Sequence, residues 1–464
     1  MRDKELRGFE FILIANQMLS IFKLSDPKVI NDIPWLKFLD DNNFSFRYYR
    51  IDGIRINIIS VILTEICILL QEYNIISYSF RSYNMMAGLT FVLFSMVVYY
   101  AFPVLRQVSI TGIFKNIGFV SNEILGTQVS VFYPSDEKYA KNTDVTYMPY
   151  PSYFDTFHFI FQRQLGIRIA PPKWLIKISG QPMAMRLMGV INNANLKILN
   201  SKMPIVVYSH GLSSNRNYQA GFCKDLASQG CIVISLQHKD KEYLEKLSVS
   251  PKEVDFVNSM HQAVIRRKEQ VKQIFDFAFD KNKLVTLFNN SEQILKFGSL
   301  QLNDKAITCG HSYGAQTAVL CGLDDDRIFA TFSLDLVMNI FDLPAFKPLI
   351  EKLVQQAVFG IMFRQLQQIL SLLLALRMKN TEHVDMIDAA LIQPRELQIV
   401  RKDIYSPNTV SMNLIMINKL AEFFIFESLQ NSPQTIDCQR VLNKFDDMSK
   451  NAIKEANPLE VIKN

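Results

Sequence analysis

One serine stands in a setting that could make it a nucleophile. Ser312 is the centre of Gly310-His311-Ser312-Tyr313-Gly314, which follows the apolar run KAITC and precedes the helix-like stretch AQTAVLCGL. A Gly-x-Ser-x-Gly pentapeptide alone is common by chance, but between a strand and a helix it forms a sharp turn that exposes the hydroxyl. The glycines of this elbow lack a Cβ, so strand and helix can approach closely, and the N-terminus of the helix favours negative charge. The pattern predicts a catalytic serine.

Such a serine needs a base to take its proton and an acid to orient that base. In α/β-hydrolases the chain order is serine, acid, histidine. His383 is the only histidine after Ser312, and it follows the apolar run Leu372–Leu376, where a loop should leave a late strand. Asp335 ends the stretch ATFSL, the first strand expected after the nucleophile helix. The order predicts Ser312, Asp335 and His383 as the catalytic triad.

Several other residues compete for these roles. Asp342 lies far along the loop after the expected strand, and Asp324-Asp325-Asp326 has the character of a solvated helix end. His210 precedes the nucleophile in the chain, and we interpret it as a loop-packing residue. These positions favour Asp335 and His383.

The oxyanion formed during acyl transfer requires two backbone N–H donors near the serine. The residue after the nucleophile, Tyr313, supplies the first. The second comes from a loop after an earlier strand, and Ser209-His210-Gly211-Leu212 follows the apolar run IVVY directly. We predict Leu212 as the second donor.

Beyond residue 107, apolar runs of strand length alternate with helical patterns. This alternation predicts an α/β-hydrolase fold, a mostly parallel sheet with helices on both faces. The expected strands are Thr127–Tyr133, Ile205–Ser209, Cys231–Leu236, Ala306–Cys309 and Ala330–Leu334, and the clearest helices are Asn217–Ser228 and Val264–Phe279. All predicted site residues lie in this part, so we expect a catalytic domain at 107–464.

The first 106 residues form a hydrophobic extension. Met85–Phe102 is free of charged residues, and Ile54–Ile76 is nearly as apolar but carries Glu65 in its middle. Both approach the length that crosses a bilayer. Arginine and lysine residues flank the outer ends, which would place both ends, and the catalytic domain, in the cytosol if both segments span. The alternatives are buried helices and a hairpin on the membrane surface.

Composition narrows the classes of partner. The 464 residues are 49% hydrophobic and 20% charged, with a net charge of +6 and no Lys/Arg tract suited to nucleic acid. The bias is compatible with an anionic membrane surface. The six cysteines are scattered, without metal-ligand spacing, and several lie in apolar runs. We therefore expect reduced cysteines, no metal site and no cofactor.

A family resemblance now becomes specific. The stretches GTQVSVFYPS, MPIVVYSHGLSSNRNYQAGFCKDLASQGCIVISLQHKD, RRKEQV, ITCGHSYGAQTAV, DDDRIFATFSLD and HVDMIDAAL resemble the platelet-activating factor acetylhydrolase family, the calcium-independent group VII phospholipases A2. The resemblance covers roughly residues 107–430. It implies a triad of Ser312, Asp335 and His383 with oxyanion donors at Leu212 and Tyr313. Ala315 replaces a common family glycine, and Pro348–Arg377 has little similarity, so the resemblance gives no acyl-chain preference.

The leading hypothesis is a membrane-attached, metal-independent esterase that hydrolyses the sn-2 ester of phospholipids with short or oxidised acyl chains. A general carboxylesterase or lipase is the alternative among enzymes, and competition with phospholipid would separate the two. A catalytically inactive membrane scaffold is the third reading, and reaction with a fluorophosphonate would decide against it.

Overall fold

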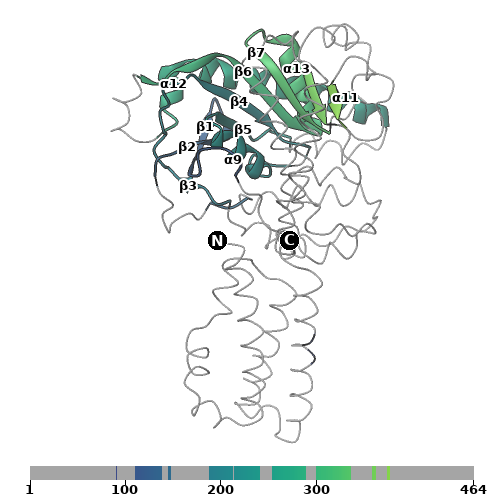
Figure 1. Ribbon diagram of the computed structural model, residues 1–464. Coiled ribbons are helices and arrows are strands. Elements are labelled where there is room, and N and C mark those ends of the chain that lie inside the picture. The colour runs from purple at the N-terminus through teal and green to yellow at the C-terminus, as the bar shows by residue number, and fades with distance from the viewer. Residues whose placement is uncertain are drawn as a thin grey trace, which may run out of the picture. The chain divides into compact units, whose positions relative to one another are not determined.

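The computed structural model describes Thr90, Leu93 and residues 110–137, 145–147, 188–212, 214–240, 253–288, 299–335, 358–361 and 374–376. The chain divides into two compact units, and all described residues but Thr90 and Leu93 lie in the unit comprising 108–171, 187–391 and 408–464. Within the described residues, nine strands form one sheet in the order β3-β1-β2-β5-β4-β6-β7-β8-β9 (Figure 1).

The sheet has an antiparallel end and a parallel body. β1 (Ile117–Ile124) and β2 (Thr127–Pro134) form a hairpin, and β2 runs antiparallel to β5 (Ile232–Leu236). β5, β4, β6, β7, β8 and β9 are parallel neighbours. Their bounds are Met203–Ser209 for β4, Leu302–His311 for β6, Ile328–Leu334 for β7, Val358–Ile361 for β8 and Leu374–Leu376 for β9. The short β3 (Ile191–Asn192) pairs with β1. This mixed sheet with flanking helices fits the predicted α/β-hydrolase fold.

Helices cover both faces because successive side chains of a strand point to opposite sides. On one face, Ile205 and Val207 of β4 belong to a core cluster with side chains of α11 (Glu253–Ala278), α12 (Lys281–Val285) and α13 (Tyr313–Asp324). On the other face, α9 (Ala220–Ser228) places Phe222 against Tyr208 of β4 and Phe332 of β7. The parallel strands β4 and β5 are therefore buried on both sides, as their continuous apolar sequences predict.

The five predicted strands are all present, with ends that differ by up to four residues. The two predicted helices also differ at their starts. α9 begins at Ala220 rather than Asn217, because residues 216–219 form turns in which Asn217 accepts a hydrogen bond from Ser130 (2.6 Å). α11 begins at Glu253 rather than Val264. Its first turns, EVDFVNSMHQ, are too polar to show a clear apolar stripe.

The late strand and the N-terminal apolar segments predicted from the sequence are only partly covered by the described residues. The segment Pro348–Arg377, expected to contain a late strand, contains β8 and β9. Ile54–Ile76 lies outside the described residues, as does Met85–Phe102 except for Thr90 and Leu93. Among the residues that the structure does describe, no helix has the length and apolar character needed to cross a membrane.

Candidate active site

Ser312 occupies a sharp turn between a strand and a helix. β6 ends at His311, α13 begins at Tyr313, and Ser312 between them has φ 56° and ψ −119°. A positive φ is strained for a residue with a Cβ and is found where the surrounding structure enforces it, often at functional sites. The Ser312 N–H donates to the Leu334 carbonyl (2.8 Å), which ties this turn to the end of β7. The local geometry is that expected of a nucleophile elbow.

The glycines of the pentapeptide are required by packing. A Cβ on Gly314 would lie 2.0 Å from the carbonyl oxygen of Ser209, and one on Gly310 would lie 2.1 Å from the carbonyl oxygen of Gly314. Both contacts are with backbone, which cannot move aside as a flexible side chain would. The close approach of α13 to β6 and β4 thus depends on these two residues, as the sequence predicted.

Asp335 leaves the sheet beside the serine. β6 and β7 are paired with His311 opposite Leu334, so the next residues, Ser312 and Asp335, emerge from neighbouring strand ends. Asp335 is buried and also has a positive φ, 47°. His383 lies outside the described residues, and so does the competing Asp342. The triad therefore stays a prediction.

Two of the three aspartates in the competing acidic run pair with basic side chains. Asp324 is exposed and pairs with Lys268 (2.8 Å), while Asp325 binds Arg327 (2.6 Å). Asp326 is exposed. Asp324 and Asp326 thus lie at a solvated helix end, as the sequence predicted, whereas the side chain of Asp325 is largely covered.

The loop after β4 lies against the serine. A Cβ built on Gly211 would be 3.4 Å from the Cβ of Ser312 and 3.2 Å from Nδ1 of His311. A larger residue at position 211 would therefore crowd the nucleophile. Leu212, the predicted second oxyanion donor, follows directly and is half-buried. The first predicted donor, Tyr313, is the opening residue of α13 and is buried.

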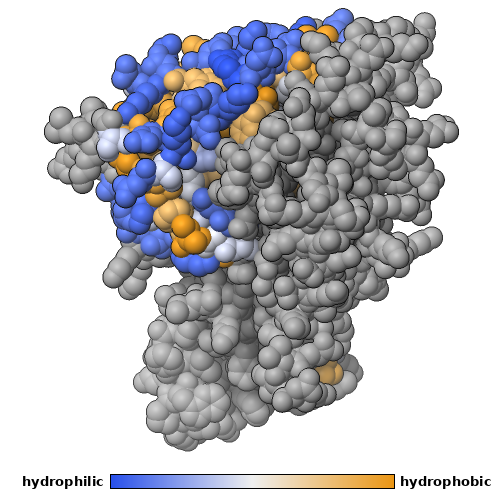
Figure 2. All heavy atoms as spheres, turned by 45° about the horizontal axis from the view of Figure 1, so that its top comes forward, coloured by the Kyte–Doolittle hydropathy of each residue, from blue (hydrophilic) through white to orange (hydrophobic). Residues whose placement is uncertain are grey.

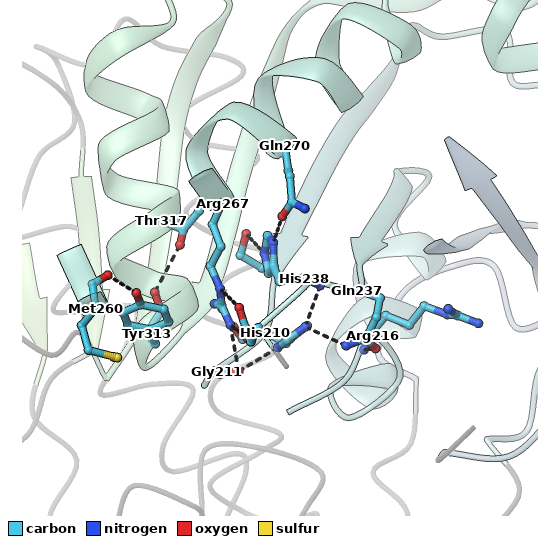
Figure 3. A network of polar contacts seen from close by, with 12 residues as sticks. His210, Gly211, Arg216, Gln237, His238, Met260, Arg267, Gln270, Tyr313 and Thr317 are labelled. Carbon is cyan, nitrogen blue, oxygen red and sulfur yellow. Dashed lines mark hydrogen bonds and ion pairs between the residues drawn. The ribbon is translucent and has the colours of Figure 1, made fainter. Parts of the chain in front are cut away.

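A buried ion pair between Arg267 and Asp240 supports this loop, and Figure 3 shows Arg267 beside His210 and Gly211. Arg267 of α11 donates from Nε to Oδ1 of Asp240 (3.0 Å), and its Nη2 contacts Oδ2 of the same carboxylate. Its Nη1 donates to the His210 carbonyl (2.7 Å), and its guanidinium stacks 4.5 Å from the ring centroid of Tyr313. Burial alone would raise the pKa of Asp240, but the adjacent Arg267 holds that pKa below its ordinary value. The guanidinium thus favours the carboxylate form of Asp240.

Two buried histidines complete the network. Nδ1 of His210 bonds the Gly211 carbonyl (2.7 Å), and its Nε2 lies 3.1 Å from the His238 backbone N–H. A carbonyl can only accept and an N–H can only donate, so His210 is the neutral Nδ1–H tautomer. Burial, and then the charge of Arg267, lower the pKa of His210 to about 4 and that of His238 well below its ordinary value. His210 thus packs within the loop, as interpreted from its sequence position.

Sequence reasoning did not single out Arg267 or Asp240. A signal for Arg267 was present, because it lies on the same helical stripe as the buried Val264, Val271 and Ile274. A cation within an apolar stripe needs a buried partner. Asp240 lies just after β5, and its pairing with Arg267 on α11, 27 positions away in the chain, is a tertiary contact that the local sequence does not indicate.

The described cysteines Cys223, Cys231, Cys309 and Cys321 are buried and form no disulfide with one another, as expected for reduced thiols. Cys67 and Cys438 lie outside the described residues. Within the described ranges, no cluster of three or more His, Cys, Asp or Glu residues could hold a metal ion.

Sequence comparison gives relatives for this arrangement. The family described as "Platelet-activating factor acetylhydrolase, isoform II" matches residues 118–275, from β1 to α11. This match is shorter than the 107–430 expected from the motifs and ends before Ser312. The platelet-activating factor acetylhydrolase of Canis lupus familiaris is 26% identical over 246 residues, which is 47% of this chain and 51% of that protein. The resemblance to this family is confirmed.

Two further relatives extend the comparison. The platelet-activating factor acetylhydrolase of Bos taurus is 24% identical over 46% of this chain and 50% of its own length, and a putative phospholipase A2 of Schizosaccharomyces pombe is 23% identical over 31% and 42%. The chain thus spans about half the length of the curated acetylhydrolases it matches. A solved ferulic acid esterase from Streptomyces cinnamoneus aligns with 67% of this chain and 87% of its own, at 15% identity and a TM-score of 0.40. The order and direction of the strands support the α/β-hydrolase fold.

Proposed function

We propose that this chain, which resembles the platelet-activating factor acetylhydrolase family, is a serine ester hydrolase of the phospholipase A2 type. The observation that carries the proposal is the strained turn at Ser312, held between β6 and α13 with the Gly211 loop against it. A hydroxyl at the end of a central strand, beside a helix N-terminus and a buried aspartate, suits attack on an ester carbonyl.

In the proposed reaction, Ser312 attacks the carbonyl while His383 takes its proton. Asp335 holds the imidazole in the correct tautomer and stabilises the imidazolium. The N–H groups of Leu212 and Tyr313 bind the oxyanion. His383 then gives the proton to the departing alcohol, and water, with the same histidine as base, hydrolyses the acyl-enzyme.

We further propose that the substrate is a phospholipid with a short or oxidised sn-2 acyl chain, because the named relatives are platelet-activating factor acetylhydrolases and a putative phospholipase A2. In excess EDTA and without calcium, a phospholipid with an sn-2 acetyl ester should be hydrolysed, and it should competitively inhibit turnover of a soluble nitrophenyl ester. If the phospholipid did not inhibit turnover of the soluble ester, a general carboxylesterase would be favoured instead. If EDTA abolished activity and Ca²⁺ restored it, the metal-independent mechanism would be contradicted.

We propose that residues 1–106 attach the catalytic domain 107–464 to a membrane, with that domain in the cytosol. The support is the apolar sequence of Met85–Phe102 and Ile54–Ile76. In the face seen in Figure 2, hydrophilic side chains cover most of the described surface, with smaller apolar areas between them.

Removing residues 1–106 should therefore release the protein from membranes and leave hydrolysis of a soluble ester intact. Partitioning in alkaline carbonate, measured for full-length and truncated chains beside soluble-ester activity, tests this. Carbonate extraction of the full-length chain would contradict spanning. An aggregated, inactive truncation would show instead that the extension is part of the hydrolase core.

A further inference from the structure

We propose that His210 and Arg267 are positioning residues that aim the Leu212 N–H at the oxyanion by holding the carbonyl group of Gly211. The inference rests on the proposed function, since it concerns the oxyanion site of that reaction. Both side chains act through the loop backbone and neither is assigned contact with substrate.

The Gly211 carbonyl oxygen accepts hydrogen bonds from three directions. Nδ1 of His210 lies 2.7 Å away, the backbone N–H of Ser214 3.2 Å, and Nη2 of Arg267 3.5 Å. The donors come from the preceding residue, from the turn that follows, and from α11, which packs across the sheet (Figure 3). Donors in three directions restrict the orientation of this carbonyl more than any single bond could.

The orientation of the Gly211 carbonyl sets the direction of the Leu212 N–H, the predicted donor. Gly211 C=O and Leu212 N–H belong to one peptide group, which is planar and trans, so the two bonds point in opposite directions. A carbonyl held toward the buried side therefore directs the Leu212 N–H away from it. If the peptide were free to rotate, the donor would be lost from the oxyanion even though every residue of the loop was present.

The same guanidinium also reaches the other predicted donor. Arg267 donates to the His210 carbonyl, one peptide earlier in the loop, and lies over the ring of Tyr313. The Tyr313 hydroxyl in turn donates to the Met260 carbonyl of α11. One helix thus holds both the loop that carries Leu212 and Tyr313, whose own N–H is the first predicted donor.

Stability alone is a weak reason for this ion pair. Side chains of Arg267 and Asp240 are 2% and 8% exposed. Taking two charges out of water has a large free-energy cost, and apolar residues of similar volume often replace such pairs without loss of stability. A positioning role explains why an arginine lies here, because its guanidinium can bind a carboxylate and two carbonyls at once in fixed directions.

The first test replaces the ion pair as a unit, with Arg267→Met and Asp240→Val together, so that no buried charge is left unpaired. We expect this variant to fold, with a melting temperature near that of the wild type. Its kcat for 4-nitrophenyl acetate should fall about 10- to 100-fold, because a small misplacement of a catalytic group has effects of this size. KM should change little. The matched control is Lys268→Met with Asp324→Asn, which removes an exposed tether between α11 and α13 (2.8 Å) and should leave kcat unchanged.

The second test uses two variants of His210 that differ in the donor. Asn places an N–H close to the position of Nδ1, whereas Leu cannot donate, and both lose the acceptor for the His238 N–H. We expect kcat to fall at least tenfold in His210→Leu and to recover most of that loss in His210→Asn, although both lower the melting temperature. This pair decides the question if the double variant does not fold.

Equal kcat values for the two His210 variants, or a folded double variant with wild-type kcat, would overturn the positioning role. Failure of the proposed function has a different signature. In that case the wild type would not hydrolyse the ester, or Ser312→Ala would hydrolyse it as well as the wild type.

Discussion

Replacing Ser312 with alanine should lower kcat for ester hydrolysis by about a million-fold and leave the protein folded. Loss of a triad nucleophile has an effect of this order, and what remains comes from the oxyanion site and substrate binding. The Ser312 side chain makes no hydrogen bond to the N-terminus of α13, so removal of its hydroxyl breaks no helix cap. Alanine also tolerates the turn about as well as serine, because both carry a single Cβ at the same positive φ.

The measurement is kcat on a soluble ester beside the thermal unfolding curve. Turnover above about a thousandth of the wild-type value, in a preparation free of other esterases, would show that Ser312 is not the nucleophile. An unchanged unfolding curve is the necessary control, since it separates loss of chemistry from loss of fold.

Replacing Asp335 with asparagine should lower kcat by about ten thousand-fold. The side chain keeps its size, but its charge no longer stabilises the imidazolium, and the amide can hold the histidine in the wrong tautomer. Asp335 is buried and lies beside the end of β6, so we expect this loss of kcat at Asp335 and not at an exposed aspartate. Hydrolysis of a soluble ester across pH 5 to 9 measures it.

Asp326→Asn is the matched control, because this exposed aspartate belongs to the competing acidic run. Its kcat should equal that of the wild type. If Asp335→Asn retained a tenth or more of wild-type kcat, the acid would have to be sought elsewhere, with Asp342 the next residue to replace.

The parallel strands could be predicted because each is a continuous apolar run. β4 and β5 are buried along their whole length, so no polar face obscures the pattern. β1 escaped prediction because Ser121, Asn122 and Glu123 interrupt its apolar residues. β1 is a strand because it pairs with β2 along its whole length, although its composition does not indicate one. The two strands are joined by a hairpin whose two-residue turn, Leu125-Gly126, has positive φ at both positions.

The elbow was predictable for a related reason. Its glycines, its serine and its flanking elements are contiguous, so local sequence specifies the turn at Ser312. The support behind the oxyanion loop is not local. His210, Asp240 and Arg267 meet because β4 and β5 are neighbours and α11 crosses them. The spacing of these residues in the sequence does not indicate this contact.

The central claim, that Ser312 is the nucleophile of a serine hydrolase, is tested most directly by a fluorophosphonate followed by mass spectrometry of tryptic peptides. Cleavage after Lys305 and Arg327 releases residues 306–327, in which Ser312 is the only serine. The account predicts one phosphonyl group per chain, on Ser312, and none after prior denaturation. Labelling of a different residue, or an unlabelled native chain, would contradict it.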